Sequence, residues 1–132
     1  YCENILGESP TLKPTQSWLN FNPPGSSHHK HWHGNSIISG VFYFKATPKS
    51  GALVLHKKES FTIKNSTINN TSFNNDMYRC FPKQYMLVLF PSTLEHSVDI
   101  NESDETRVSL AFNTFYRDTT IGDEFNLSGL KL

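Results

Sequence analysis

The sequence predicts an all-β protein, a double-stranded β-helix (jelly roll) with little helix. Its apolar runs are short and often alternate with polar residues, which is the period of a β-strand. Phenylalanine alone contributes ten of the 132 residues, and aromatic side chains favour strands. Residues that favour turns bound these runs. The length predicts one domain, residues 1–132, that buries roughly two-thirds of its unfolded surface.

The first half of the chain holds four candidate strands. Residues 17–21 include Trp18 and Phe21 and end at a Pro-Pro-Gly turn. Three further apolar or β-branched segments follow, at 37–45, 52–55 and 60–63. The next stretch, 64–75, is rich in Asn, Ser and Thr, so we expect an exposed loop there. In a metal enzyme this loop is also a candidate substrate lid.

The second half holds three candidate strands. Residues 84–90 form an apolar run that ends at Pro91, and 97–100 and 107–115 flank a polar turn at 101–105. The last two segments therefore predict a hairpin. Beyond Arg117 a few apolar residues could dock on a sheet, and we assign them no function. Seven short strands with no helix between them favour a jelly roll.

Composition limits the classes of partner. Twelve basic and twelve acidic residues give no net charge, so binding to nucleic acid or to a membrane surface is not indicated. No stretch approaches the ~20 apolar residues of a membrane span. Two distant cysteines, Cys2 and Cys80, fit a reducing compartment. We expect a cytoplasmic protein.

Three histidines predict a metal site. His31 and His33 are two residues apart, so on an extended backbone both side chains face one side. Gly25 and Gly34 allow the chain to bend around them. His96 follows the apolar run 84–90 through a proline turn, where it can complete one facet of a coordination sphere. The spacing is that of a mononuclear iron site.

Arg107 and Ser109 predict an acid-binding site beside this metal. They are two residues apart and therefore share a face of the second hairpin strand, close to His96. A keto acid chelates iron through its keto oxygen and adjacent carboxylate. Its far carboxylate needs a planar, permanently charged donor such as arginine, and a hydroxyl can share that carboxylate.

These residues resemble the pattern of the iron(II)/2-oxoglutarate-dependent dioxygenases: His-x-Asp or Glu, a distal His, and about ten residues later Arg-x-Ser. More closely, residues 17–113 are similar to small 2-oxoglutarate/iron oxygenases of marine bacteria and their phages. The residues that carry this likeness are Ser17-Trp-Leu-Asn20, Gly25, His31-x-His33, Asn35-Ser36, Ser39-Gly40-Val41-x-Tyr43, Leu89-Phe-Pro-Ser92, His96, Val98, Asn101, Arg107-x-Ser109 and Phe112-Asn113.

The resemblance implies a role for each matching residue. His31, His33 and His96 would bind Fe(II), with His33 in place of the usual carboxylate. Arg107 and Ser109 would bind the co-substrate 2-oxoglutarate, with Asn20 and Tyr43 as further candidates. The implied reaction uses O2, releases succinate and CO2, and hydroxylates an unknown prime substrate. Trp32 and Phe44 are expected to line the pocket, and a partner protein or a homodimer interface is a candidate for completing it.

Two alternatives remain open. The segment from Gly25 to His33 also resembles the first motif of the cupins, which include three-histidine metal dioxygenases and isomerases. The glutamate of that motif is missing, because Ile37 and Ile38 occupy its place. The second alternative is a non-enzymatic binding module in which the histidines, with Glu95 or Cys80, hold a structural zinc.

Overall fold

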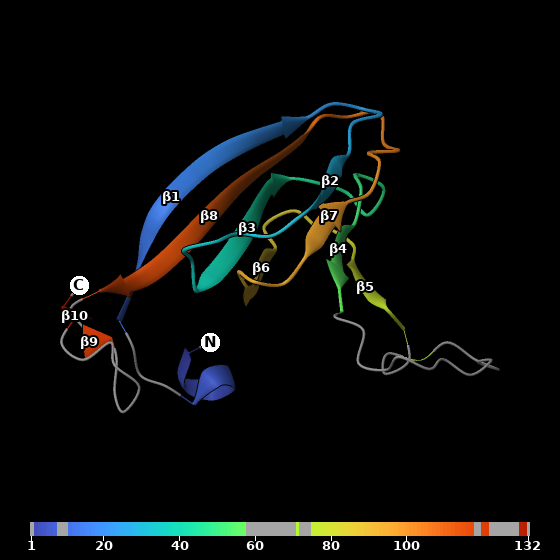
Figure 1. Ribbon diagram of the computed structural model, residues 1–132. Helices are drawn as coiled ribbons and strands as arrows, with labels where there is room; N and C mark the ends of the chain where they lie inside the picture. Colours follow the sequence, from blue (N-terminus) through green and yellow to red (C-terminus); the bar gives the residue numbers. More distant parts are fainter. Residues whose placement is uncertain are drawn as a thin grey trace.

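The computed structural model describes residues 2–7, 11–57, 71, 75–117, 120–121 and 130–131. Apart from one helical turn at Cys2–Leu6, the elements are strands. Figure 1 shows them in two layers. The strands are β1 (Thr11–Asn22), β2 (His28–His31), β3 (Ile38–Lys45), β4 (Leu53–His56), β5 (Met77–Cys80), β6 (Leu87–Pro91), β7 (His96–Val98), β8 (Arg107–Arg117), β9 (Thr120–Ile121) and β10 (Leu130–Lys131).

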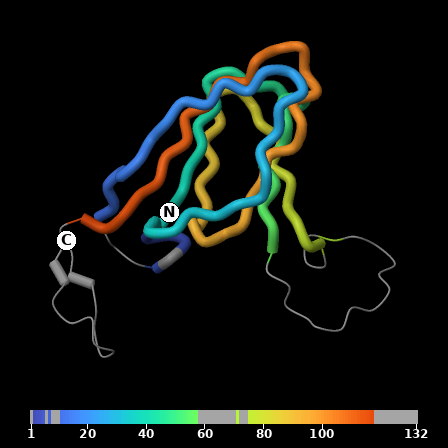
Figure 2. The backbone as a smooth tube through the Cα atoms, turned by 45° about the horizontal axis from the view of Figure 1, so that its top comes forward, coloured from blue at the N-terminus to red at the C-terminus, as the bar shows by residue number. Residues whose placement is uncertain are grey.

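Two four-stranded antiparallel sheets make up the fold. The first has the strand order β1-β8-β3-β6, and the second has the order β2-β7-β4-β5. The tube in Figure 2 shows the chain passing repeatedly from one layer to the other. Strands β9 and β10 pair with each other beyond the end of β8. The architecture confirms the predicted double-stranded β-helix, and no helix among the described residues is long and apolar enough to cross a membrane.

Six of the seven predicted strands are present. The segments at 37–45, 52–55 and 107–115 correspond closely to β3, β4 and β8, and 97–100 overlaps β7 at residues 97–98. The hairpin predicted from 97–100 and 107–115 is wrong, because β7 pairs with β2 and β4 in the second sheet and β8 pairs with β1 and β3 in the first. Strand β1 extends well beyond 17–21 at its start, and β6 begins three residues later than predicted because Lys83 to Met86 form a turn. The segments 60–63 and 64–74, apart from residue 71, lie outside the described residues, as does most of the chain after Arg117. Strands β2 and β5 were not predicted.

A buried hydroxyl network joins the first sheet to the loops at its end. Oγ of Ser92 lies 2.7 Å from Oγ of Ser36 and 2.8 Å from Oγ of Ser39. Ser39 donates to Oδ1 of Asn113 at 2.7 Å, and Ser36 donates to the backbone oxygen of Thr114. All five residues are buried. Buried polar groups that satisfy one another in this way hold their strands in a single arrangement.

The outer face of the first sheet is apolar. Leu19, Leu110, Phe42 and Leu87 stand in one row across β1, β8, β3 and β6, as their pairing register shows. Phe44 packs edge-on against Phe42, with ring centroids 5.0 Å apart. Leu19 and Leu87 are each more than half exposed. The opposite, inner face of this sheet carries polar residues and faces the second sheet.

Candidate active site

A pocket of about 110 Å³ opens between the two sheets. Strands β1, β3 and β8 supply one wall, and β2, β4 and β7 supply much of the other. Every residue that the sequence predicted for metal or co-substrate binding lines it: Asn20, His31, His33, Tyr43, His96, Arg107 and Ser109. The fold therefore brings residues from five separated segments of the chain to one cavity.

Three imidazoles meet at one end of the pocket. His31 on β2 is paired with His96 on β7, and their ring centroids are 4.3 Å apart. The ring of His33, just beyond β2, lies 5.1 Å from each of the other two. One ring nitrogen from each histidine lies within 4.8 Å of the others, which is close enough for small adjustments to bring all three to one metal ion.

Backbone hydrogen bonds orient these rings. Nδ1 of His31 donates to the backbone oxygen of His29, and Nδ1 of His96 donates to that of Leu94, each at 2.9 Å. In both rings Nε2 is then the nitrogen with a free lone pair, as in metal-binding histidines. The backbone N–H of His33 donates to the oxygen of buried Ser92 at 3.0 Å. The hydroxyl network thus anchors the third histidine.

The surroundings favour neutral imidazoles. Burial lowers the pKa of His96 to about 4, and the imidazoles of His31 and His33 act in the same direction. Burial, followed by the nearby rings of His31 and His28, also lowers the pKa of His33. A neutral imidazole is the form that binds a metal ion. The edge of the Trp18 ring lies against His33, with centroids 5.9 Å apart.

Arg107 is the cation of the pocket, and it is 5% exposed. Its Nη1 donates to the backbone oxygens of Ser50 and Gly51 at 3.1 Å each, and its Nη2 donates to Oδ1 of Asn22 at 3.0 Å. Among the described residues, Nε of Arg107 is a buried nitrogen with no hydrogen-bond partner. Burial lowers the pKa of Arg107, yet a guanidinium stays charged in proteins. A buried charge held only by neutral groups is suited to an anionic ligand.

Glycine at position 51 makes this arrangement possible. Its backbone has a φ of +88°, and a Cβ there would lie 2.2 Å from the backbone oxygen of Asp99. Only glycine therefore fits at this position. The left-handed backbone that it adopts directs its carbonyl oxygen to the guanidinium of Arg107.

The other three predicted co-substrate residues stand in one row. Ser109 on β8 is paired with Asn20 on β1 and with Tyr43 on β3. Ser109 and Tyr43 are each 2% exposed. Burial raises the pKa of Tyr43 to about 12, so its hydroxyl keeps its proton at neutral pH. The row offers hydroxyl and amide groups next to Arg107, whose Cζ lies 5.9 Å from the centre of the Tyr43 ring.

Some details differ from the sequence-based expectations. Trp32 and Phe44 were expected to line the pocket, but they are 57% and 43% exposed and are not part of its wall. Trp18 and Phe90 line it instead. Gly25 and Gly34 were expected to let the chain bend around the site. Gly25 has a left-handed backbone, with a φ of +79°, but after His33 the left-handed residue is Asn35 rather than Gly34.

Sequence reasoning assigned no site role to three polar residues of the pocket, Asn22, His28 and Ser39. Asn22 could have been found, because it lies two residues after Asn20 on the same face of β1. His28 could not, because it lies three residues before His31, an interval that puts side chains on opposite faces of a regular strand, and an irregularity in β2 turns it inward.

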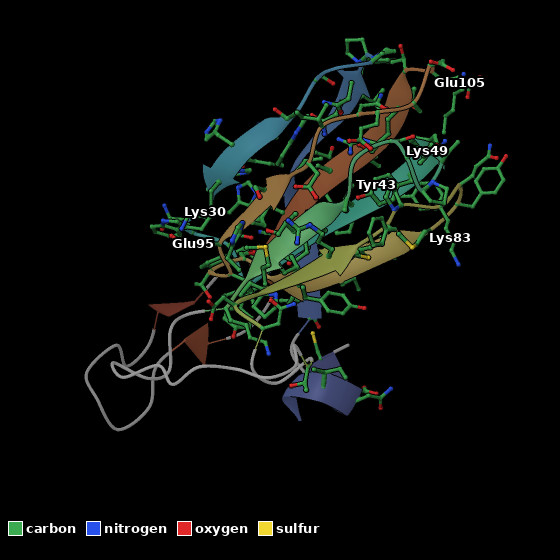
Figure 3. All side chains as sticks on the ribbon, turned by 90° about the vertical axis from the view of Figure 1, so that its right-hand side faces the viewer. Lys30, Tyr43, Lys49, Lys83, Glu95 and Glu105 are labelled. Atoms are coloured by element: carbon green, nitrogen blue, oxygen red, sulfur yellow. The ribbon has the colours of Figure 1, made fainter. Side chains whose placement is uncertain are left out.

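The donor set fits an iron ion with a keto acid. Three neutral imidazoles are suitable ligands for Fe(II), and a facial set of three leaves positions for other ligands. The buried arginine with its unpartnered Nε fits a carboxylate in the same cavity. Glu95, which could have closed a structural zinc site, forms a 2.9 Å salt bridge with Lys30. Figure 3 shows these two side chains side by side at the edge of the second sheet.

Solved structures share this fold. A 2OG-Fe(II) oxygenase family oxidoreductase from Burkholderia pseudomallei matches with a TM-score of 0.66 and 13% identity, over 85% of this chain and 48% of that chain. AviO1 from Streptomyces viridochromogenes Tue57 matches with a TM-score of 0.59 and 14% identity, over 78% of this chain and 50% of that one. HygX from Streptomyces hygroscopicus, solved with nickel and 2-oxoglutarate bound, matches with a TM-score of 0.55 and 11% identity, over 80% and 58%.

The chain spans about half the length of these structures. No curated protein matches it. The model of one family, described as "Putative 2OG-Fe(II) oxygenase", matches residues 16–113. This match covers most of the chain and includes all seven pocket residues predicted from the sequence. The chain therefore belongs to this family of 2OG-Fe(II) oxygenases.

Proposed function

We propose that this chain is a 2-oxoglutarate/Fe(II)-dependent dioxygenase that hydroxylates a prime substrate. One observation carries the proposal: three converging imidazoles and a buried arginine without a carboxylate partner among the described residues line the same pocket. A dicarboxylic keto acid has a chelating end for a metal and a free carboxylate for a guanidinium. The iron and co-substrate, when bound, supply oxidation of a C–H bond with O2, releasing succinate and CO2.

Each residue has a defined task in this proposal. His31, His33 and His96 hold Fe(II). Both N–H groups of Nη1 and one of Nη2 in Arg107 already have acceptors, so that Nε and the second N–H of Nη2 remain to bind the far carboxylate. Ser109 and Tyr43 add hydroxyl donors, and Asn20 adds an amide. Because the clamp is assembled before the acid arrives, little ordering accompanies binding. Phe90, whose ring packs edge-on against His96 with centroids 4.7 Å apart, limits access of water to the metal end.

The third histidine affects the charge balance. In the common pattern of this class a carboxylate stands where this chain has His33. A neutral imidazole leaves the full charge of Fe(II) for the other ligands to balance, so binding of the dianionic co-substrate should matter more here. HygX, which shares the fold, is a case in which 2-oxoglutarate and a metal are bound together. The likeness supports the proposal and leaves the substrate open.

The test is an anaerobic titration of the Fe(II) protein with 2-oxoglutarate. Chelation by the keto acid should produce a weak visible charge-transfer band that saturates with one equivalent per chain. His96→Ala should abolish the band, and His56→Gln should retain it, because His56 lies outside the pocket and bonds Ser97. A protein that gives no band but holds zinc tightly would be a structural module. Cysteine-dependent oxygen uptake without the band would indicate cupin chemistry.

The prime substrate can be sought by product release. Amino acids, peptides and nucleobases, added singly, should be compared for the rate of succinate formation above the uncoupled rate. A true substrate raises succinate formation and gains one oxygen atom by mass. Stimulation that persists in His96→Ala would come from a contaminating enzyme.

A further inference from the structure

A fourth imidazole enters the pocket through an irregularity in β2. His28 is paired with Val98, and His31 is paired with His96. Between these two pairs β2 advances by three residues, whereas β7 advances by two. The extra residue makes a β-bulge. Without it, residues three apart on a strand would point to opposite faces. With it, His28 and His31 both line the pocket, with ring centroids 4.5 Å apart.

The ring of His28 stacks on that of His29, with centroids 4.8 Å apart, but burial does not account for this inward turn. His28 is an exposed residue, so the bulge buries little of its surface. Nor does His28 belong to the metal-binding group: among the described residues, that group consists of His31, His33 and His96. The bulge therefore presents an accessible polar ring to the pocket, and such irregularities are common beside active sites.

His28 lies on the side of the three histidines that leads to Arg107. Just before β2, the backbone N–H of Gly25 donates to the oxygen of Asn101, and the N–H of Asn101 donates to the oxygen of Ser26. The side chain of Asn101 donates in turn to the backbone oxygen of Asn22, whose own side chain holds Arg107. His28 therefore lies nearer than His31 to the guanidinium end of the pocket.

We propose that His28 is a co-substrate-binding residue, whose ring N–H donates a hydrogen bond to an oxygen of the dicarboxylate that spans the three histidines and Arg107. This inference rests on the function proposed above. A molecule that is anchored at both ends of the pocket passes His28, the pocket imidazole that is not part of the metal-binding group. A ring N–H there adds a donor to the anion from the second sheet, opposite Ser109 and Tyr43 on the first.

Binding to the Ni(II)-loaded protein tests this without turnover. His28→Phe keeps a ring against His31 and removes the N–H. It should weaken 2-oxoglutarate binding about 10-fold in calorimetry, the size expected for one hydrogen bond to a charged group. Ni(II) affinity should change by less than about 2-fold. His28→Gln, which restores an N–H donor, should recover most of the loss. The matched control is His29→Gln on the same strand, outside the pocket wall, and it should bind like the parent.

The outcomes separate the two proposals. If His28→Phe binds 2-oxoglutarate as the parent does, His28 has no role in binding the acid, and the inference fails. If the variant loses Ni(II), His28 is a metal ligand, and the inference also fails. If the parent itself binds Ni(II) but no 2-oxoglutarate, the proposed function fails and the role of His28 falls with it. Thermal melts of the metal-free variants will show whether the fold is intact, and His28 is exposed enough that we expect it to be.

Discussion

Asn22 and Arg107 stand opposite each other on β1 and β8, and Nη2 of Arg107 donates a 3.0 Å hydrogen bond to Oδ1 of Asn22. The guanidinium is further held by two backbone oxygens of the loop before β4. Three neutral acceptors thus fix its plane, while Nε has no partner among the described residues. A buried guanidinium held in this way is suited to an anionic ligand.

Arg107→Ala should weaken 2-oxoglutarate binding by about 3–5 kcal/mol, because a bound carboxylate loses its charged partner in a partly buried site. Metal affinity should change little, since the guanidinium is not a ligand. Calorimetry of the Ni(II) protein measures both quantities. Lys45→Ala is a suitable control, because Lys45 forms an exposed pair with Glu105. Equal binding of the acid by Arg107→Ala and the parent would remove Arg107 from the site.

Asn22→Leu should weaken 2-oxoglutarate binding by about 1 kcal/mol, the usual contribution of one hydrogen bond. Asn22 acts here by positioning Arg107, so the loss should disappear when Arg107 is already absent. The double variant with Arg107→Ala should therefore bind the acid no more weakly than Arg107→Ala alone. Additive losses in this cycle would mean that Asn22 contacts the acid directly.

His33→Asp should retain Fe(II) binding or strengthen it, because a carboxylate is an equally suitable iron ligand and adds a negative charge. His33→Leu, which has no donor atom, should weaken Fe(II) binding by more than about 100-fold. Anaerobic competition with a coloured chelator gives both affinities. Should the two variants bind Fe(II) like the parent, His33 lies outside the coordination sphere.

Gly51→Ala should destabilise the protein by more than about 2 kcal/mol. The new Cβ combines a left-handed backbone with a backbone clash against Asp99, and the backbone there cannot shift without disturbing Arg107. Gly25→Ala is the matched control. Its φ is also positive, at +79°, but nothing lies within 4 Å of the added Cβ, so it should cost only about 1 kcal/mol. Urea unfolding measures the difference, and equal losses would show that the clash is relieved.

The fold was predictable because β3, β4 and β8 carry clear apolar or alternating patterns. Strand β2 was not, because His28–His31 reads His-His-Lys-His and has no apolar residue to mark it. It pairs through its backbone with β7, which is a tertiary effect that no local pattern reveals. Strand β5, Met77–Cys80, is similar: an edge strand whose side chains are mostly half or fully exposed.

The candidate site was predictable where the spacing of residues along a strand determines the direction in which their side chains point. Residues two apart on a strand share a face, which placed Arg107 with Ser109 on β8. His33 lies just beyond β2, and its ring still meets that of His31. Contacts that depend on loops were hidden. The carbonyls of Ser50 and Gly51 reach Arg107 only because of a left-handed turn, and His28 reaches the pocket only through a bulge.

The central claim is that three imidazoles and one guanidinium bind a metal ion and a keto acid together in this pocket. A crystal structure of the protein grown anaerobically with Ni(II) and 2-oxoglutarate tests it most directly. The account predicts a metal ion coordinated by His31, His33 and His96, chelated by the acid, whose far carboxylate contacts Arg107. A metal ion bound elsewhere, or an acid that leaves Arg107 without a carboxylate partner, would contradict it.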